Sequence, residues 1–180
     1  MLLTGEQEVS IGDSMLTSPS EDNRLRVLVL CTGNSARSIM AEALLNTVGA
    51  QLFRAWSAGS KPAGRANPLA LEQMNHLALP VTMEIRSKSW DEFTGPDAQE
   101  IDLVLTVCGN AAQSCPRFAG DYEHVHWGFS NPAGSSADIE QERIAFQQCF
   151  TELNRRVTSL VPLPNNSSKS AVIDAMRAFI

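Results

Sequence analysis

The sequence has no run of eighteen apolar residues, so no segment is long enough to cross a membrane as a helix. It also lacks an excess of positive charge: the formal net charge is −6, whereas a general nucleic-acid binder shows a basic balance. Its first six residues lack the basic start and apolar stretch of a secretory signal. We therefore expect a cytoplasmic protein that binds neither membranes nor nucleic acids and holds any anionic substrate by a local arrangement of groups.

Closely spaced metal ligands are missing as well. The chain has four cysteines and three histidines. No Cys-x-x-Cys pair occurs, and the histidines do not form a ligand set with the cysteines, so we expect no metal site. In the reducing cytoplasm, cysteines are more often catalytic or buried than joined as structural disulfides.

The sequence does contain enough apolar material for one core. Of its 180 residues, 43% are hydrophobic and 19% are charged, which suits one folded domain. We expect this domain over residues 25–162, after a polar, disordered leader at 1–24. Prolines and an Asn-Asn-Ser-Ser stretch then introduce a C-terminal tail at 163–180, in which residues 169–180 can form a short helix. We expect a monomer.

Apolar runs of strand length alternate with helical patterns along this domain. Strands are expected at 26–30, 53–57, 102–107 and 123–126, and helices after the first strand as far as Gly49, at 67–79 and at 137–161. Such alternation predicts an α/β fold of three layers, in which a four-stranded parallel sheet carries helices on both faces. In that class, ligands bind beyond the carboxyl ends of the strands.

Small residues and an arginine follow the first expected strand directly. The segment reads Cys31, Thr32, Gly33, Asn34, Ser35, Ala36, Arg37 and Ser38, and it leads into a helix. Small residues let the backbone curl so that its N–H groups bind an anion at the helix N-terminus. Arg37 can close the ring with a planar guanidinium suited to a tetrahedral oxyanion. The same groups favour a thiolate at Cys31, to which Ser38 can donate a hydrogen bond.

Two interpretations of Cys31 follow, a nucleophile beneath an oxyanion cradle or a buried cysteine before an ordinary turn, and the first is favoured. The segment resembles the Cys-x5-Arg-Ser loop shared by low-molecular-weight tyrosine phosphatases and the arsenate reductases of that fold. The likeness extends over about residues 25–160 through Ser57-Ala58-Gly59, Asn67-Pro68, Arg86-Ser87-Lys88-Ser89-Trp90, Thr106-Val107-Cys108, Cys115-Pro116 and His126-Trp127-Gly128-Phe129. It implies a phosphatase-like fold in which residues 32–37 bind arsenate, with phosphate or sulfate as analogues.

Two further cysteines favour the reductase, because a phosphatase needs one nucleophile. The resemblance implies that Cys31 attacks arsenate, that Cys108 then attacks Cys31 and releases arsenite, and that Cys115 resolves the disulfide. Thioredoxin, or alternatively glutathione, would reduce the final Cys108–Cys115 disulfide, with no cofactor bound. A disulfide needs Cα atoms about 4.4–6.8 Å apart. Seven residues of helix span roughly 10.5 Å, so a helix between these cysteines would have to unwind.

Asn131 departs from the family pattern, since phosphatases, and usually the reductases, have an aspartate general acid there. An amide cannot donate a proton as an acid does. The loss weakens the phosphatase interpretation more, because a phenolate leaving group needs that proton. Another acid such as Asp138 could act instead. A low-molecular-weight phosphatase and a non-catalytic oxyanion-binding protein remain as alternatives to a thioredoxin-coupled arsenate reductase that serves arsenic detoxification.

Lys88 is a second departure. Some family members hold a potassium ion near the loop, and Asn34, Glu42 and Ser57 match three of its ligand positions. Lys88 falls where the fourth, an aspartate, would be, and its ammonium is either a fixed substitute for the ion or an ordinary solvated charge. A cysteine on the apolar stripe of the last long helix, Cys149, is expected to fill the core.

Overall fold

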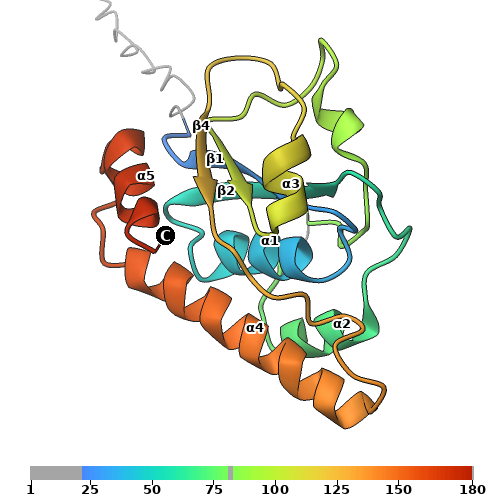
Figure 1. Cartoon of the computed structure of the whole chain (residues 1–180). Coiled ribbons are helices and arrows are strands. Elements are labelled where there is room, and N and C mark those ends of the chain that lie inside the picture. The colour runs from blue at the N-terminus through green and yellow to red at the C-terminus, as the bar shows by residue number, and fades with distance from the viewer. Residues whose placement is uncertain (1–21, 81–82, 180) are drawn as a thin grey trace, which may run out of the picture.

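Four parallel strands form a single sheet in the order β2-β1-β3-β4 (Figure 1). The computed structural model describes residues 22–80 and 83–179, so nearly all of the expected leader lies outside the described residues. The strands are β1 (Leu25–Cys31), β2 (Phe53–Gly59), β3 (Leu103–Thr106) and β4 (Glu123–His126). All neighbouring strands pair in parallel, which confirms the predicted sheet.

The central strand β1 is covered on both faces. Its residues 27–30 are all 0% exposed. Because successive side chains of a strand point to opposite faces, layers of chain must lie above and below it. The continuous apolar run in the sequence thus corresponds to a parallel strand that is buried on both faces.

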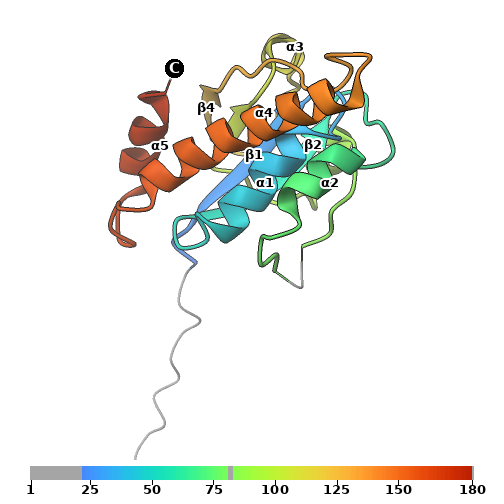
Figure 2. The same ribbon diagram turned by 90° about the horizontal axis from the view of Figure 1, so that it is seen from below.

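Three helices gather on one side of the sheet. Helices α1 (Arg37–Thr47), α2 (Pro68–Met74) and α4 (Ile139–Leu160) pack against one another and lie together in Figure 2. The short helices η1 (Trp90–Phe93) and α3 (Gly109–Ser114) pack against strands, η1 on β2 and α3 on β1 and β3. Within the described ranges, none of the helices has the length and apolar character to span a membrane.

Helix α2 is shorter than the sequence predicted. Its start is as expected, because the Asn67 side chain accepts a hydrogen bond from the Leu69 N–H at 2.8 Å and a proline follows the cap. It ends at Met74 rather than near residue 79. The Leu77 N–H bonds to the Met74 carbonyl in a tighter, i to i−3 turn that closes the helix end.

The helix expected in the C-terminal tail is present as α5 (Lys169–Arg177), and it is part of the core. Its apolar face consists of Val172, Ile173 and Met176, which are all buried. The fully buried indole of Trp127 donates from Nε1 to the Met176 carbonyl at 3.0 Å. Residues after 163 are therefore more than an appendage to the domain.

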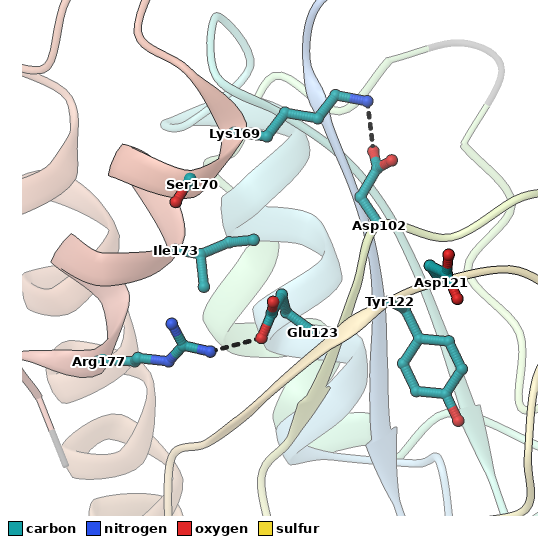
Figure 3. A pocket seen from close by; sticks show the side chains of 8 residues that line it. All are labelled: Asp102, Asp121, Tyr122, Glu123, Lys169, Ser170, Ile173 and Arg177. Atoms are coloured by element: carbon teal, nitrogen blue, oxygen red, sulfur yellow. Dashed lines mark hydrogen bonds and ion pairs between the residues drawn. The ribbon is translucent and has the colours of Figure 1, made fainter.

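Ion pairs also hold α5 to the amino ends of the strands (Figure 3). Asp102 accepts from the Arg26 guanidinium at 2.8 and 3.0 Å and from Lys169 Nζ at 2.8 Å. Arg177 pairs with Glu123 at 2.7 Å beside a cavity of about 290 Å³. Burial acts to raise the pKa of Asp102, but hydrogen bonds from Arg26 and Lys169 outweigh it and hold that pKa at about 2.

Candidate active site

The loop between β1 and α1 curls around the Cys31 sulfur at the carboxyl edge of the sheet. Backbone carbonyls of residues 31, 32, 33 and 35 accept hydrogen bonds from backbone N–H groups of residues 60–67, which run along the outside of the loop. With its carbonyls facing out, the loop can direct its N–H groups inward, and the Asn34 N–H donates to Cys31 Sγ at 3.1 Å. This is the backbone arrangement that binds anions.

Two backbone positions make this tight curl possible. Asn34 has a φ of 41°, in the left-handed region that asparagine tolerates better than most residues. Gly59, where β2 ends, lies against the loop so closely that a Cβ atom would stand 2.5 Å from the Thr32 carbonyl oxygen. A larger residue at Gly59 would push the loop out of place.

Ser38 completes the surroundings of the Cys31 sulfur. Its Oγ lies 2.9 Å from Cys31 Sγ and also accepts a hydrogen bond from Asn34 Nδ2 at 2.9 Å. Because Ser38 already accepts from the amide, its own proton is free to point at the sulfur. Two donors, the Asn34 N–H and the Ser38 hydroxyl, thus face Cys31, and both stabilise a thiolate.

A buried polar network extends from Asn34 to a lysine. Asn34 Nδ2 also donates to Ser57 Oγ at 2.8 Å, and Ser57 donates to Glu42 Oε2 at 2.5 Å. Lys88 Nζ lies 3.5 Å from the same carboxylate oxygen, and both of these charged side chains are 6% exposed. Burial raises the pKa of the Glu42 carboxyl, and the Lys88 ammonium acts against this. Lys88 is therefore a buried ion-pair partner and not a solvated charge.

Arg37, the first residue of α1, is held from the far side of the site. Its Nη1 donates to the Phe129 carbonyl oxygen at 2.9 Å, in the segment that follows β4. Sequence reasoning noted Phe129 as part of a motif but gave it no role. A contact between a side chain and a backbone carbonyl 92 positions away leaves no local pattern in the sequence.

The second thiol of the expected relay lies beside the loop. Cys108 leaves β3 next to β1, because the Val107 N–H bonds to the Leu30 carbonyl at 2.9 Å. Cys108 Sγ is 3.6 Å from Thr32 Oγ1, on the residue that follows Cys31. All the cysteines are free thiols. Adjacent parallel strands thus bring residues 31 and 108 to one edge of the sheet.

The third thiol, Cys115, is separated from Cys108 by helix α3. Cys108 occupies the N-terminal cap position and Cys115 the C-terminal one, so the helical start considered from the sequence is present. Cys115 is half-buried, and burial raises the pKa of its thiol. In this conformation it is a weak nucleophile, because the thiolate is the attacking species.

Among the described residues, neither Asn131, at the position of the family's general acid, nor the alternative acid Asp138 makes a hydrogen bond to the loop. Asn131 is exposed and donates from Nδ2 to the Ala133 carbonyl at 2.8 Å. Asp138 is the exposed cap of α4, where its side chain accepts from the Glu140 N–H at 2.9 Å. Cys149 is buried, which raises the pKa of its thiol to about 11, as expected of core filling.

The sequence model for the family described as low molecular weight phosphotyrosine protein phosphatase matches residues 26–171. The chain belongs to this family. Within it, curated relatives are arsenate reductases. The protein of Halalkalibacterium halodurans is 33% identical over 135 residues, covering 75% of this chain and 94% of the relative. That of Bacillus cereus strain AH187 is 35% identical over 136 residues, covering 76% and 93%.

Solved structures agree with both the family and the fold. An arsenate reductase from Archaeoglobus fulgidus matches with a TM-score of 0.54 at 30% identity, covering 76% of this chain and 99% of that chain. A low molecular weight protein tyrosine phosphatase from T. tengcongensis matches with a TM-score of 0.55 at 23% identity, which shows the shared fold alone. The resemblance identified from the loop residues is thereby confirmed.

Proposed function

We propose that the protein reduces arsenate to arsenite with Cys31, Cys108 and Cys115. The observation that carries this proposal is the Cys108 sulfur, 3.6 Å from the hydroxyl of Thr32 at the rim of the anion loop. A hydrolytic phosphatase has no use for a second thiol there. The similarity to arsenate reductases supports the same conclusion.

The reaction proceeds by thiol–disulfide exchange. The Cys31 thiolate attacks arsenic(V) and a sulfur–arsenic bond forms, while the bond from arsenic to one of its hydroxyl groups breaks; that hydroxyl takes one proton from solvent and leaves as water. The Cys108 thiolate attacks the Cys31 sulfur, the sulfur–arsenic bond breaks, and its electron pair leaves with arsenic as arsenite. Cys115 then attacks Cys108 and frees Cys31. The resulting Cys108–Cys115 disulfide takes two electrons from an external dithiol, for which we propose thioredoxin.

Helix α3 has to unwind during the last internal step. A six-residue helix between the two thiols keeps their Cα atoms roughly 10.5 Å apart, well beyond the reach of a disulfide. Ala111 is its buried residue, and a helix this short is marginal without packing. Unwinding therefore exposes little apolar surface. It also releases Cys115 from the burial that raises the pKa of its thiol.

Lys88 and Asn131 fit the reductase in different ways. We propose that the Lys88 ammonium permanently fills the role of a cation beside Glu42, so that the network behind Cys31 needs no potassium. Arsenate can carry the proton of its own leaving oxygen, and an amide at position 131 is then less harmful than in a phosphatase. Exchange among free thiols suits a reducing compartment, so we still expect a cytoplasmic location. We also still expect the protein to be a monomer.

Coupled turnover tests the proposal. Purified protein with arsenate, thioredoxin, thioredoxin reductase and NADPH should produce arsenite and consume NADPH in equal amounts. Cys108→Ala should abolish this turnover, and Cys149→Ala, which removes a core thiol, should keep it. No NADPH consumption, with the coupling enzymes shown to be active on another disulfide, contradicts the proposal. Glutathione with glutaredoxin in place of thioredoxin identifies the donor. Rapid aryl phosphate hydrolysis that survives Cys108→Ala would instead indicate the phosphatase.

A further inference from the structure

Arg37, which we expect to bind the oxyanion, is held by a backbone carbonyl whose own segment makes weak hydrogen bonds. Arg37 Nη1 is anchored by the Phe129 carbonyl oxygen at 2.9 Å. The N–H of Phe129 reaches the Val107 carbonyl at 3.4 Å, the outer limit of a hydrogen bond. Gly128, which has no side chain to restrict the backbone, precedes Phe129, and exposed Ser130 follows it. The backbone alone therefore does little to fix where the Phe129 carbonyl points.

A second arginine holds the ring of the same residue. The Arg156 guanidinium carbon, on α4, lies 4.6 Å from the centroid of the Phe129 ring and 5.6 Å from that of Trp127. Trp127 is fully buried and bonded to α5, so it gives Arg156 a rigid surface. Glu152, one helical turn away, accepts from Arg156 Nε at 3.0 Å and so restrains the same guanidinium group from another side. A guanidinium can lie flat against an aromatic ring, which a lysine ammonium cannot do.

Burying this arginine carries a free-energy cost. Its side chain is 14% exposed, and Nη1 is buried with no hydrogen-bond partner in the part of the chain that the structure describes. An unpaired buried donor is unfavourable, and an apolar side chain of similar length would fill the same space without it. A role beyond packing accounts for a charged group there.

We propose that Arg156 is a positioning residue: its contact with the Phe129 ring sets the direction of the Phe129 carbonyl, which in turn aims Arg37 at the oxyanion. The inference rests on the proposed oxyanion site. It is distinct from the reaction, since Arg156 itself touches neither Cys31 nor the anion loop. Removing Arg156 should weaken oxyanion binding without weakening the fold.

The strength of oxyanion binding can be measured by how well phosphate protects Cys31 from alkylation. The readout is the phosphate concentration that halves the rate of Cys31 alkylation by iodoacetamide, followed by mass spectrometry of the Cys31 peptide. Arg156→Met and Phe129→Leu should each raise this concentration about tenfold, and the double variant no further, because both break one contact. Arg155→Met is the matched control. Arg155 pairs with the same Glu152 but is 61% exposed and lies over Phe179 instead, so protection should stay within about twofold of wild type.

Stability and turnover separate positioning from folding. Arg156→Met should leave the melting temperature unchanged or raise it, and in arsenate turnover it should raise KM about tenfold while kcat falls less than about threefold. The proposal is overturned if Arg156→Met or Phe129→Leu retains wild-type phosphate protection, if Arg155→Met loses as much, or if the double variant shows the product of the two single effects. Absence of arsenate turnover in the wild-type protein would contradict the proposed function and leave this inference standing, since it is measured with phosphate.

Discussion

Ser38 illustrates how one side chain sets the chemistry of its neighbour. Its hydroxyl accepts from Asn34 and so has its proton available for the Cys31 sulfur. A donor at this distance stabilises the thiolate relative to the thiol. Since thiolate is the nucleophile, part of the reactivity of Cys31 resides in Ser38.

Ser38→Ala should therefore slow alkylation of Cys31 by iodoacetamide at neutral pH, by roughly tenfold if one charge-assisted hydrogen bond is lost. Ser60→Ala is a suitable control, because the bond from Ser60 to the loop comes from its backbone N–H. An unchanged alkylation rate in Ser38→Ala would show that the hydroxyl does not donate to the sulfur.

Lys88 offers a test of the buried network. Lys88→Ala leaves Glu42 buried without its cation, which typically costs about 3–5 kcal/mol of unfolding free energy. It also leaves a space beside the carboxylate, so potassium should raise the melting temperature of this variant more than choline does at equal ionic strength. The melting temperature of the wild-type protein should change equally in potassium and in choline salts. Stimulation of wild-type turnover by potassium would contradict the substitution of lysine for the ion.

The residues of the anion loop could be predicted because they are contiguous in the sequence. Small side chains, an arginine and a helix start lie within eight positions, and backbone geometry alone relates them. Phe129 and Arg156 could not be found in this way. The contacts of Phe129 and Arg156 join segments that lie far apart in the chain. In the sequence, an arginine on a long helix looks like an ordinary surface charge, and its aromatic neighbours become visible only in the folded structure.

For the helices and strands, local sequence patterns predicted the middle of each element better than its ends. The sequence predicted β4 over Glu123–His126 as observed, and α4 to within about two residues. The length of helix α2 was overestimated. The five residues after Met74 contain no strong helix-stop signal before Pro80, but the tighter turn at Leu77 ends the helix first. The order of the strands in the sheet was not predicted, because the sequence of a single strand does not specify which strands lie beside it.

Helix α3 gives a prediction about conformation. Cys115→Ser should permit at most one turnover, because the Cys31–Cys108 disulfide can no longer pass to position 115. Mass spectrometry after peptide digestion should find that disulfide accumulated. In the wild-type protein, oxidation to Cys108–Cys115 should abolish amide protection over residues 109–114 in hydrogen exchange. Sustained thioredoxin-dependent turnover by Cys115→Ser, or a protected α3 in the oxidised protein, would contradict the relay.

In the molecule as a whole, α5 covers the edge of the sheet that is formed by the amino ends of the strands. This helix lies far along the sequence from the strands that it contacts. Sequence reasoning gave this helix little weight because it follows prolines and polar residues. Its buried face and the ion pairs of Asp102 show that it completes the core on the side opposite the anion loop. One end of the sheet thus serves stability and the other serves chemistry, which is a common division in parallel α/β proteins.

Asp102 makes the contribution of this edge measurable. Arg26 and Lys169 hold the pKa of its carboxyl at about 2, below its usual 3.8, so its stabilising effect is complete above pH 3.8 and is lost as the pH falls toward 2. After allowance for screening by solvent, the shift corresponds to about 1–2 kcal/mol of unfolding free energy at neutral pH. Urea unfolding of Asp102→Asn should show that loss at pH 7, and the difference from wild type should shrink as the pH falls from 4 toward 2. Asp121→Asn, an exposed change beside the same cavity, should match wild type throughout (Figure 3). A loss in Asp102→Asn that stays constant down to the lowest pH would mean that the side chain acts by shape and not by charge.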